Sequence, residues 1–207
     1  MRVRILPFGD RAVLAEYDSL SATIGAYRAL SASTPRGLVE LVPAARTVLV
    51  RVDPQVLPLD AARRWLLSVR PGDELDGPLP TTVTIAVTYD GEDLDDAARL
   101  LGITVDELIA RHTGTEWTCA FVGFAPGFAY LTSASDPLVV PRRSTSRPAV
   151  PAGSVGLAGE FTGVYPRESP GGWQLIGRTD AVLWDATKDF PARISPGDLV
   201  RFTAVDR

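Results

Sequence analysis

The residues best suited to chemistry lie in a segment of unusual composition, residues 121–131, which reads FVGFAPGFAYL. It mixes aromatic side chains with glycine and proline, which neither a regular helix nor an alternating strand tolerates. Pro126 presets φ, and Gly127 can take the positive φ of a type II turn. We therefore predict a strand that runs into a tight turn, with aromatic rings on both sides of exposed backbone N–H groups. The alternative is a hairpin corner that only fills the core.

Two glycine-containing loops further along the chain could bind an anion through backbone N–H groups. They are residues 151–154, which read PAGS, and residues 169–174, which read SPGGWQ. In the second loop the two glycines permit a ligand to approach the backbone closely. The tryptophan supplies an aromatic surface and the glutamine supplies an amide. Ser154 faintly resembles the nucleophile of a strand–turn–helix elbow, but the sequence after it is turn-rich rather than helical.

Arginines supply the remaining candidate contacts to an anion. Arg142, Arg143 and Arg147 form the densest cationic cluster, three within six residues, which suits a carboxylate or a phosphate better than a duplex. With the aromatic segment and the loops, they predict a pocket for a small polar, anionic ligand. The candidate substrate-binding residues are Gly123, Phe124, Pro126, Gly127, Phe128, Tyr130, Arg143, Pro151, Ala152, Gly153, Ser154, Gly171, Gly172, Trp173, Gln174 and Arg178.

Composition argues against several other functional classes. The net charge of −4 and the pI near 5.1, without any basic run, argue against a nucleic-acid surface. Lys188 is the only lysine and follows no glycine-rich loop, so a Walker A phosphate loop is absent and nucleotide chemistry must rely on other residues or another chain. One histidine and one cysteine do not predict a zinc site with the usual nitrogen and sulfur ligands.

The cysteine and the apolar runs bear on the cellular compartment. Cys119 has no partner for a disulfide within the chain, and its apolar neighbours predict a buried strand thiol rather than a nucleophile. No apolar run approaches the ~18 residues that span a membrane. The N-terminus also lacks the apolar core of a signal peptide. We expect a cytoplasmic protein without membrane contact.

The N-terminal third must fold into strands and helices. We expect strands at residues 3–6, 12–17, 38–42 and 47–52, with helices at 20–31 and from about Asp60. This order predicts a small α+β domain of ferredoxin-like type over residues 1–75, with its helices on one face of one sheet. Residues 70–80 hold three prolines, two glycines and three acidic residues, and form the best domain boundary in the chain.

Residues 81–207 must position the candidate site. A strand at 82–88 and helices at 93–101 and 104–112 come first. Short apolar runs broken by glycine and proline then recur at roughly 8–12 residues, which is typical of a barrel or a sandwich. His112 lies near the end of the second helix, where a histidine ordinarily interacts with free carbonyls.

Four strings carry a resemblance to a known family: residues 123–131, 141–143, 150–156 and 163–179. They resemble the KipI/PxpB family, which comprises the B subunits of 5-oxoprolinase and was formerly labelled allophanate hydrolase subunit 1. The family is also similar to part of the carboxyltransferase region of urea carboxylase. The resemblance covers essentially the whole chain. It implies a small α+β N-terminal domain followed by a cyclophilin-like, mostly antiparallel β-barrel over residues 81–207.

The resemblance also implies an activity and two protein partners. One is a KipA/PxpC-like protein, here called the KipA-like partner, and the other is a LamB/YcsF-like protein (PxpA), here called the LamB/YcsF-like partner. The complex hydrolyses 5-oxo-L-proline to L-glutamate with ATP. ATP is thus expected to be used by the complex, with no contact to this chain implied.

The candidate catalytic residues are His112 and Arg142. His112 falls where the family carries a histidine before the motif strand, and Arg142 belongs to the arginine cluster within the family strings. The resemblance therefore adds a functional interpretation of His112 to the ordinary one of a helix-terminal histidine.

Two departures from the family pattern bear on the substrate. Ala129 stands where the family commonly has proline, and Glu160 stands where it often has a second glycine. Either could alter substrate preference. The alternatives are therefore an allophanate- or urea-related amidohydrolase subunit, and an inhibitor of a sporulation histidine kinase of the KipI type. A prolyl isomerase, suggested by the barrel alone, is a weaker hypothesis because a fold carries no activity by itself.

Overall fold

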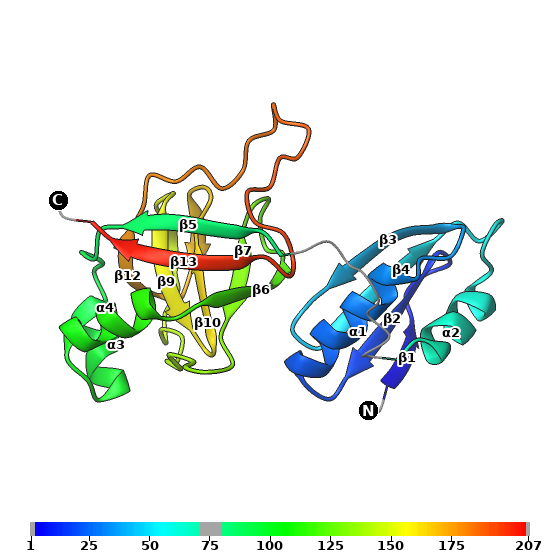
Figure 1. Cartoon of the computed structure of the whole chain (residues 1–207), viewed down its shortest axis with the longest axis horizontal. Coiled ribbons are helices and arrows are strands. Elements are labelled where there is room, and N and C mark those ends of the chain that lie inside the picture. Colours follow the sequence, from blue (N-terminus) through cyan, green and yellow to red (C-terminus); the bar gives the residue numbers. More distant parts are fainter. Residues whose placement is uncertain (1–2, 71–79, 206–207) are drawn as a thin grey trace. The chain divides into compact units, whose positions relative to one another are not determined.

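The computed structural model describes residues 3–70 and 80–205, which fall into two compact units (Figure 1). The first unit spans Met1–Leu79 and the second Pro80–Arg207. Most of the boundary expected at residues 70–80 lies outside the described residues. Each unit has its own core of buried residues, so each is described by itself.

The first unit is one four-stranded sheet with two helices. Its elements are β1 (Val3–Pro7), β2 (Ala12–Tyr17), α1 (Leu20–Ala32), β3 (Leu38–Pro43), β4 (Thr47–Val52) and α2 (Leu59–Ser68). The strands pair in the order β1-β2-β4-β3, and every pairing is antiparallel. The predicted strands and helices are therefore present, in the order ββαββα. A ferredoxin-like fold would run βαββαβ, and the described residues do not show that order.

One face of this sheet is covered by both helices. Alternate residues of β2 and β4 point to the same side of the sheet. The inward residues pack in a single cluster with Ala26 and Leu30 of α1 and Ala62 and Leu66 of α2. Ser19 begins α1, because its hydroxyl accepts a hydrogen bond from the backbone N–H of Ala22 at 3.2 Å.

The second unit carries most of the strands. Its elements are β5 (Thr82–Val87), α3 (Leu94–Leu101), α4 (Val105–Gly114), β6 (Trp117–Val122), β7 (Ala129–Thr132), β8 (Arg147–Val150), β9 (Ser154–Ala158), β10 (Phe161–Val164), β11 (Ser169–Gly171), β12 (Gln174–Arg178) and β13 (Leu199–Ala204). Seven of the strands form one sheet in the order β12-β9-β10-β7-β6-β13-β5, and β8 pairs separately with β11.

This seven-stranded sheet nearly closes on itself, as predicted for a barrel (Figure 1). Its two ends meet at Thr88 and Arg178, which exchange backbone hydrogen bonds of 2.9 Å in both directions. The sheet is mixed, because β13 runs parallel to β5 while the other neighbours are antiparallel. Helices α3 and α4 pack against β12 and β13. The interior of the sheet is filled by apolar side chains such as Ile85, Leu157 and Phe202.

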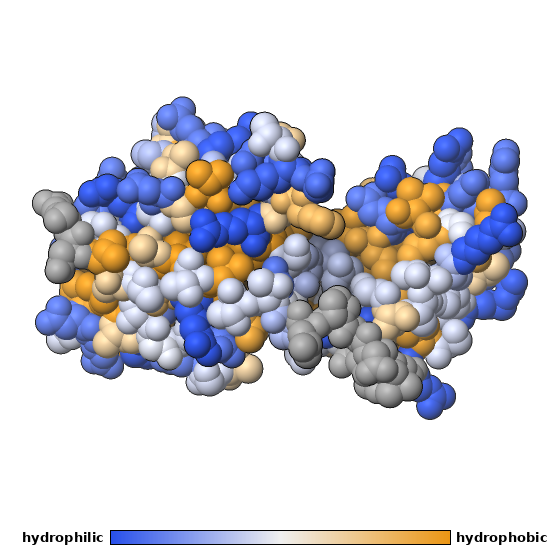
Figure 2. Space-filling model, turned by 45° about the horizontal axis from the view of Figure 1, so that its top comes forward, coloured by the Kyte–Doolittle hydropathy of each residue, from blue (hydrophilic) through white to orange (hydrophobic). Residues whose placement is uncertain are grey.

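The environment of the single thiol and the hydropathy of the surface are typical of a globular protein. Cys119 is buried in β6, as predicted, and burial raises the pKa of its thiol to about 12. Hydrophilic residues cover much of the face shown in Figure 2, with apolar patches between them. Among the described residues, the helices are too short and too polar for any of them to span a bilayer.

Candidate functional site

The turn between β6 and β7 has the conformation that its sequence predicts. Gly127 has a φ of 82°, and the N–H of Phe128 donates to the carbonyl of Ala125 at 3.0 Å. These are the features of a type II turn with Pro126 at its second position. The N–H of Gly123 donates to the carbonyl of Phe128 at 3.1 Å. The expectation of exposed N–H groups is therefore wrong for Gly123 and Phe128, because the turn itself uses them.

Phe124 is the strained point of this turn. Its φ of 67° is the only positive φ of a non-glycine residue in the described part of the chain. The N–H of Ala125 donates to the carbonyl of Gly123 at 2.7 Å, so Phe124 occupies the centre of a three-residue γ-turn. A backbone strained in this way costs of order 1–3 kcal/mol and is found preferentially at functional sites. Phe124 is 58% exposed.

Behind this turn lies a cluster of aromatic rings on the outer face of the sheet. Tyr130 belongs to it, whereas its neighbours in β7 belong to the barrel interior, as strand alternation requires. Phe128 is 1% exposed and packs edge-to-face on Tyr165 at 5.2 Å and on Trp173 at 5.3 Å, measured between ring centroids. Half-buried Tyr130 and Phe161, with exposed Phe124, bring the cluster to solvent.

Arg142 brings a positive charge to this cluster. Burial raises the pKa of the Tyr130 and Tyr165 phenols, and the charge of Arg142 opposes that increase. Arg142 is exposed and forms no ion pair with any of the described residues. Aromatic faces beside an unpaired guanidinium can bind a small flat anion.

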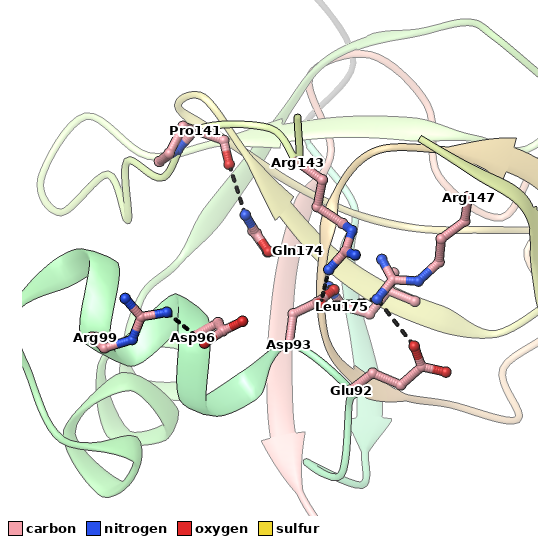
Figure 3. A network of polar contacts seen from close by, with 9 residues as sticks. All are labelled: Glu92, Asp93, Asp96, Arg99, Pro141, Arg143, Arg147, Gln174 and Leu175. Carbon is pink, nitrogen blue, oxygen red and sulfur yellow. Dashed lines mark hydrogen bonds and ion pairs between the residues drawn. The ribbon is translucent and has the colours of Figure 1, made fainter. Parts of the chain in front are cut away.

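Arg143 and Arg147 have a different role from Arg142 (Figure 3). Arg143 donates to Asp93 at 2.5 Å, and Arg147 donates to the same oxygen at 2.9 Å. The other oxygen of Asp93 accepts from the backbone N–H of Leu175 at 2.7 Å. The Asp93 side chain is only 3% exposed. In this structure Arg143 pairs with Asp93 inside the protein, and substrate binding by Arg143 stays a prediction.

Asp93 is thus a buried carboxylate that ties β12 to the segment with the two arginines. Burial acts to raise its pKa, but the hydrogen bonds from Arg147 and Leu175 and the charge of Arg143 outweigh that effect, and the pKa is lowered. Asp93 was predicted only as the first residue of a helix. Its partners lie 50 to 82 positions away in the sequence, so local pattern gives no signal of this contact.

The loop at residues 151–154 uses the N–H groups of Gly153 and Ser154 inside the protein, contrary to the prediction for these two donors. Gly153 has a φ of 80°, and its N–H donates to the carbonyl of Tyr165 at 2.8 Å. The N–H of Ser154 donates to Pro151 at 3.3 Å, within the turn. The two donors are used inside the protein, and Ser154 is 7% exposed. Ala152, the remaining residue of the loop, is exposed.

The space beside the two glycines of the second loop is occupied by other side chains of the protein. A Cβ on Gly171 would lie 2.2 Å from the Tyr165 hydroxyl, and a Cβ on Gly172 would lie 2.9 Å from the Ser146 hydroxyl. The side-chain amide of Gln174 donates to the carbonyl of Pro141 at 3.1 Å (Figure 3). The close approach predicted for a ligand is therefore made by neighbouring side chains. Of the residues in this loop, only Trp173 joins the aromatic cluster.

His112 lies inside the barrel. The residue is 0% exposed, with Nδ1 2.7 Å from the Tyr89 hydroxyl and Nε2 2.9 Å from the Thr162 hydroxyl. Thr162 donates to the carbonyl of Gly156 at 3.2 Å, so it accepts from Nε2–H, and Tyr89 donates to Nδ1. Burial lowers the pKa of His112 to about 3, which keeps it neutral. The catalytic prediction for His112 is wrong here, because no ligand can reach the ring.

Arg178 lies outside the aromatic cluster. Its guanidinium pairs with Asp90 at 3.0 Å, and it borders a cleft of about 280 Å³. The cleft is lined by Thr84, Ala86, Thr88, Arg178, Thr179, Asp180, Ala181, Arg193 and Val205. Thr179 connects this region to the 151–154 loop through a 2.9 Å hydrogen bond to the carbonyl of Gly153. The structure thus brings together the aromatic residues and Arg142, and leaves Arg178 apart from them.

Comparison with known proteins identifies the family. The family model of the carboxyltransferase domain, subdomain C and D, matches residues 3–194. The chain is 41% identical over 170 residues to the 5-oxoprolinase B subunit of Escherichia coli O157:H7, an alignment that covers 80% of this chain and 77% of that protein. The chain belongs to the family of 5-oxoprolinase B subunits. The resemblance stated from the sequence is confirmed.

Other members and solved structures agree with this family assignment. The chain is 44% identical over 126 residues to the 5-oxoprolinase B subunit of Bacillus subtilis, covering 59% of this chain and 52% of that protein. It superimposes on TTHA0988 with a TM-score of 0.78 and 32% identity, covering 95% of this chain but only 40% of the TTHA0988 chain. Urea amidolyase of K. lactis shares the fold, with a TM-score of 0.75 at 21% identity over 98% of this chain and 15% of that one.

Two residues of the cluster, Phe161 and Tyr165, were not among the predicted site residues. Both flank Gly163, and a Cβ on Gly163 would meet Trp173 at 3.3 Å and Phe128 at 3.4 Å. Once β10 is recognised as a strand, alternation places positions 161, 163 and 165 on one face. This alternation of aromatic, glycine and aromatic residues is the sequence pattern from which Phe161 and Tyr165 could have been assigned to the site.

Proposed function

We propose that this chain is the B subunit of an ATP-dependent 5-oxoprolinase complex, which opens the cyclic amide of 5-oxo-L-proline to give L-glutamate. The observation that supports this most strongly is the 41% identity to the E. coli O157:H7 protein over 77% of its length. In this proposal the chain is active only in the complex, with the KipA-like and LamB/YcsF-like partners in the cytoplasm. Residues 1–75 act as the small α+β domain and residues 81–207 as the cyclophilin-like barrel.

The proposed role of the aromatic cluster is to bind the substrate. 5-Oxoproline is a small ring with a planar amide and one carboxylate. The planar amide packs on the rings of Phe124 and Tyr130, while Arg142 pairs with the carboxylate. Phe128 and Trp173 support these rings from behind, since both are buried. Gly127 and its neighbours Gly123 and Pro126 shape the turn that carries Phe124.

The chemical groups that this chain lacks must then come from the partner proteins. Lys188 lies on an exposed turn, 3.7 Å from the carboxylate of Asp185, and is not in a phosphate-binding loop. Burial lowers the pKa of His112 to about 3 and seals the ring in the barrel, so this side chain is too weak a base and too inaccessible to activate water. We therefore assign the ATP phosphates and the activation of the attacking water to the two partners. This chain binds and orients the substrate.

Reconstitution tests the proposed function. The purified chain is mixed with the KipA-like and LamB/YcsF-like partners, and ADP release is followed as 5-oxoproline is added. We expect 5-oxoproline-dependent ADP release only when all three chains are present. Undiminished turnover without this chain would exclude the proposal.

A second candidate function, as part of an amidohydrolase for allophanate or urea, has one observation in its favour. The chain is 38% identical over 65 residues to urea amidolyase of Saccharomyces cerevisiae, which is 29% of this chain and 4% of that protein. The same reconstituted mixture, given allophanate or urea in place of 5-oxoproline, distinguishes the two. The kinase-inhibitor hypothesis gains no support from the B. subtilis relative, which carries the enzyme's name.

A further inference from the structure

Asp93 stands at the N-cap of helix α3, but its side chain does not cap the helix. An aspartate at this position ordinarily accepts a hydrogen bond from a backbone N–H of the first turn. The Asp93 side chain makes no such bond. One carboxylate oxygen accepts instead from the N–H of Leu175, and the other accepts from Arg143 and Arg147 (Figure 3). The helix therefore forgoes a cap, and the carboxylate is used to hold two arginines.

The backbone of Asp93 is itself fixed to β12. The N–H of Asp93 donates to the carbonyl of Leu175 at 2.9 Å, so the two residues are joined by a backbone bond as well as by the side-chain bond. Gly91 lies so close to β12 that a Cβ on it would be 2.3 Å from the carbonyl oxygen of Leu175. The carboxylate of Asp93 is therefore a rigid attachment point for the arginines that it binds.

The chain on both sides of Arg142 is attached to neighbouring residues. The carbonyl of Pro141 accepts from the side-chain amide of Gln174 at 3.1 Å (Figure 3). The N–H of Arg143 donates to the carbonyl of Gly172 at 2.8 Å, and its guanidinium pairs with the carboxylate described above. Arg142 lies between these attachments, so its backbone position is set by them.

The ion pairs of the arginine cluster leave Arg142 as the arginine without a partner. Arg143 and Arg147 share one oxygen of Asp93, and Arg147 also reaches the exposed carboxylate of Glu92 at 3.0 Å. Two guanidinium groups are thus matched by two carboxylates. Arg142 is exposed and has no ion pair with any described residue. Its charge is the one that an anionic ligand can still use.

The charge of Arg142 acts at the aromatic cluster. It opposes the increase that burial causes in the pKa of the Tyr130 and Tyr165 phenols. Both tyrosines pack with the buried rings of the cluster. An element that sets the position of Arg142 therefore also sets where the cluster can bind an anion.

We propose that Asp93 is a positioning residue, which fixes the segment at residues 141–147 so that Arg142 is held where it meets the bound anion. The inference rests on the proposed function, in which Arg142 pairs with the substrate carboxylate. Asp93 is not placed to touch a ligand, since its side chain is buried and both of its oxygens already accept hydrogen bonds. Its effect on substrate binding therefore passes through Arg142.

Asp93→Asn in the reconstituted complex tests the inference. Asparagine keeps an oxygen that can accept from the N–H of Leu175, but it lacks the charge that holds the arginines. We expect the KM for 5-oxoproline to rise about tenfold with kcat nearly unchanged, because Arg142 binds the substrate and does not react with it. Asp96→Asn is the matched control and should keep the wild-type KM, since Asp96 lies in the same helix but pairs with Arg99 on the surface (Figure 3).

A second substitution separates positioning from a general loss of structure. In an Arg142→Gln background, Asp93→Asn should cause no further rise in KM, because the group that it positions is already gone. Arg147→Gln gives the same test if Asp93→Asn does not fold, since it leaves Asp93 paired with Arg143. An equal rise in KM in both backgrounds would overturn the inference. So would a folded Asp93→Asn variant whose KM is no higher than that of Asp96→Asn.

Hydrogen exchange of the chain alone measures the positioning without any substrate. Peptides that cover residues 141–147 are followed by mass spectrometry. The N–H of Arg143, which donates to the carbonyl of Gly172, should exchange about tenfold faster in Asp93→Asn and at the wild-type rate in Asp96→Asn. Unchanged exchange of this segment in Asp93→Asn would contradict the proposal.

Failure of the proposed function gives a different pattern. If the wild-type complex shows no 5-oxoproline-dependent ADP release, the substrate assignment fails, and faster exchange in Asp93→Asn still supports the role of Asp93 in fixing the segment. If turnover is normal in the wild type and Asp93→Asn changes neither the KM nor the exchange, the enzyme assignment stands and the positioning role fails.

Discussion

At the scale of single residues, Arg142 differs in its contacts from Arg143 and Arg147, the other members of the arginine cluster. Arg143 and Arg147 pair with Asp93, whereas Arg142 is exposed and has no ion pair among the described residues. We expect Arg142→Gln to raise the KM for 5-oxoproline in the reconstituted complex about tenfold or more, because a charge-assisted hydrogen bond contributes roughly 1.5–3 kcal/mol. Arg167→Gln, at another exposed arginine, should leave the KM unchanged. Equal values for the two variants would remove Arg142 from the site.

His112 makes a prediction about pH and stability. Its pKa falls from 6.5 to about 3 on folding because burial disfavours the charged form. Between these values the unfolded chain binds a proton that the folded chain does not, so His112 makes stability decrease as pH falls from 6.5 towards 3. The slope from this one group is about 1.4 kcal/mol per pH unit. Above pH 6.5 the group contributes no pH dependence.

Replacing this histidine should therefore change stability in a pH-dependent way. His112→Gln loses the stacking on Phe202 and is expected to be less stable at pH 7 by about 2–4 kcal/mol. The difference from the wild type should shrink between pH 6.5 and 4, as followed by urea unfolding. Turnover of the folded variant should keep the wild-type pH profile near neutrality. A shifted profile would restore the catalytic hypothesis.

At the scale of elements, the β6–β7 turn depends on a glycine. Gly127 has a positive φ, and a Cβ there would lie 2.8 Å from the Cβ of Trp184. We expect Gly127→Val to destabilise the chain by about 2–4 kcal/mol and to abolish activity of the complex, because strain and overlap add. Gly123→Ala is the control, since it has no positive φ and no atom within 4 Å of the added Cβ. Thermal unfolding and ADP release report the two effects.

The ring behind the turn gives an independent prediction for the same element. Phe128 is 1% exposed and packs against four aromatic neighbours, Phe124, Tyr130, Tyr165 and Trp173. Phe128→Ala should cost about 3–5 kcal/mol of stability and abolish turnover by the complex. If Phe128→Ala and Gly127→Val both assemble and turn over normally, the turn is only a corner of the core.

At the scale of the whole molecule, the two cores consist of residues from separate units. The barrel core draws on positions from Val83 to Phe202, and the other core on positions from Val13 to Leu66. We propose that they are independent domains and expect residues 80–207, expressed alone, to unfold cooperatively, because no side chain of its core is removed. A fragment without dispersed amide resonances or a cooperative thermal transition would contradict this.

The elements of the first unit, the two helices of the second and the β6–β7 turn could be predicted from the sequence, because they depend on local chemistry. Pro126 followed by Gly127 favours a type II turn, and alternation or helical periodicity marks several of the strands and helices. The strained φ of Phe124 was not predictable, since nothing in its residue type favours a positive φ. It is imposed by the hydrogen bonds of the turn around it.

By itself, the sequence determined the family, the local turns and the presence of a barrel. Tertiary structure alone decided which polar residues remain free. Gly153, Gly171 and Arg143 all have residue types suited to a ligand. The N–H of Gly153 instead donates to the carbonyl of Tyr165, the Tyr165 hydroxyl occupies the space beside Gly171, and Arg143 pairs with Asp93. The physical reason is that buried donors and charges must be satisfied within the fold. Arg142 and exposed Phe124 remain available because the fold gives neither of them such a partner among the described residues.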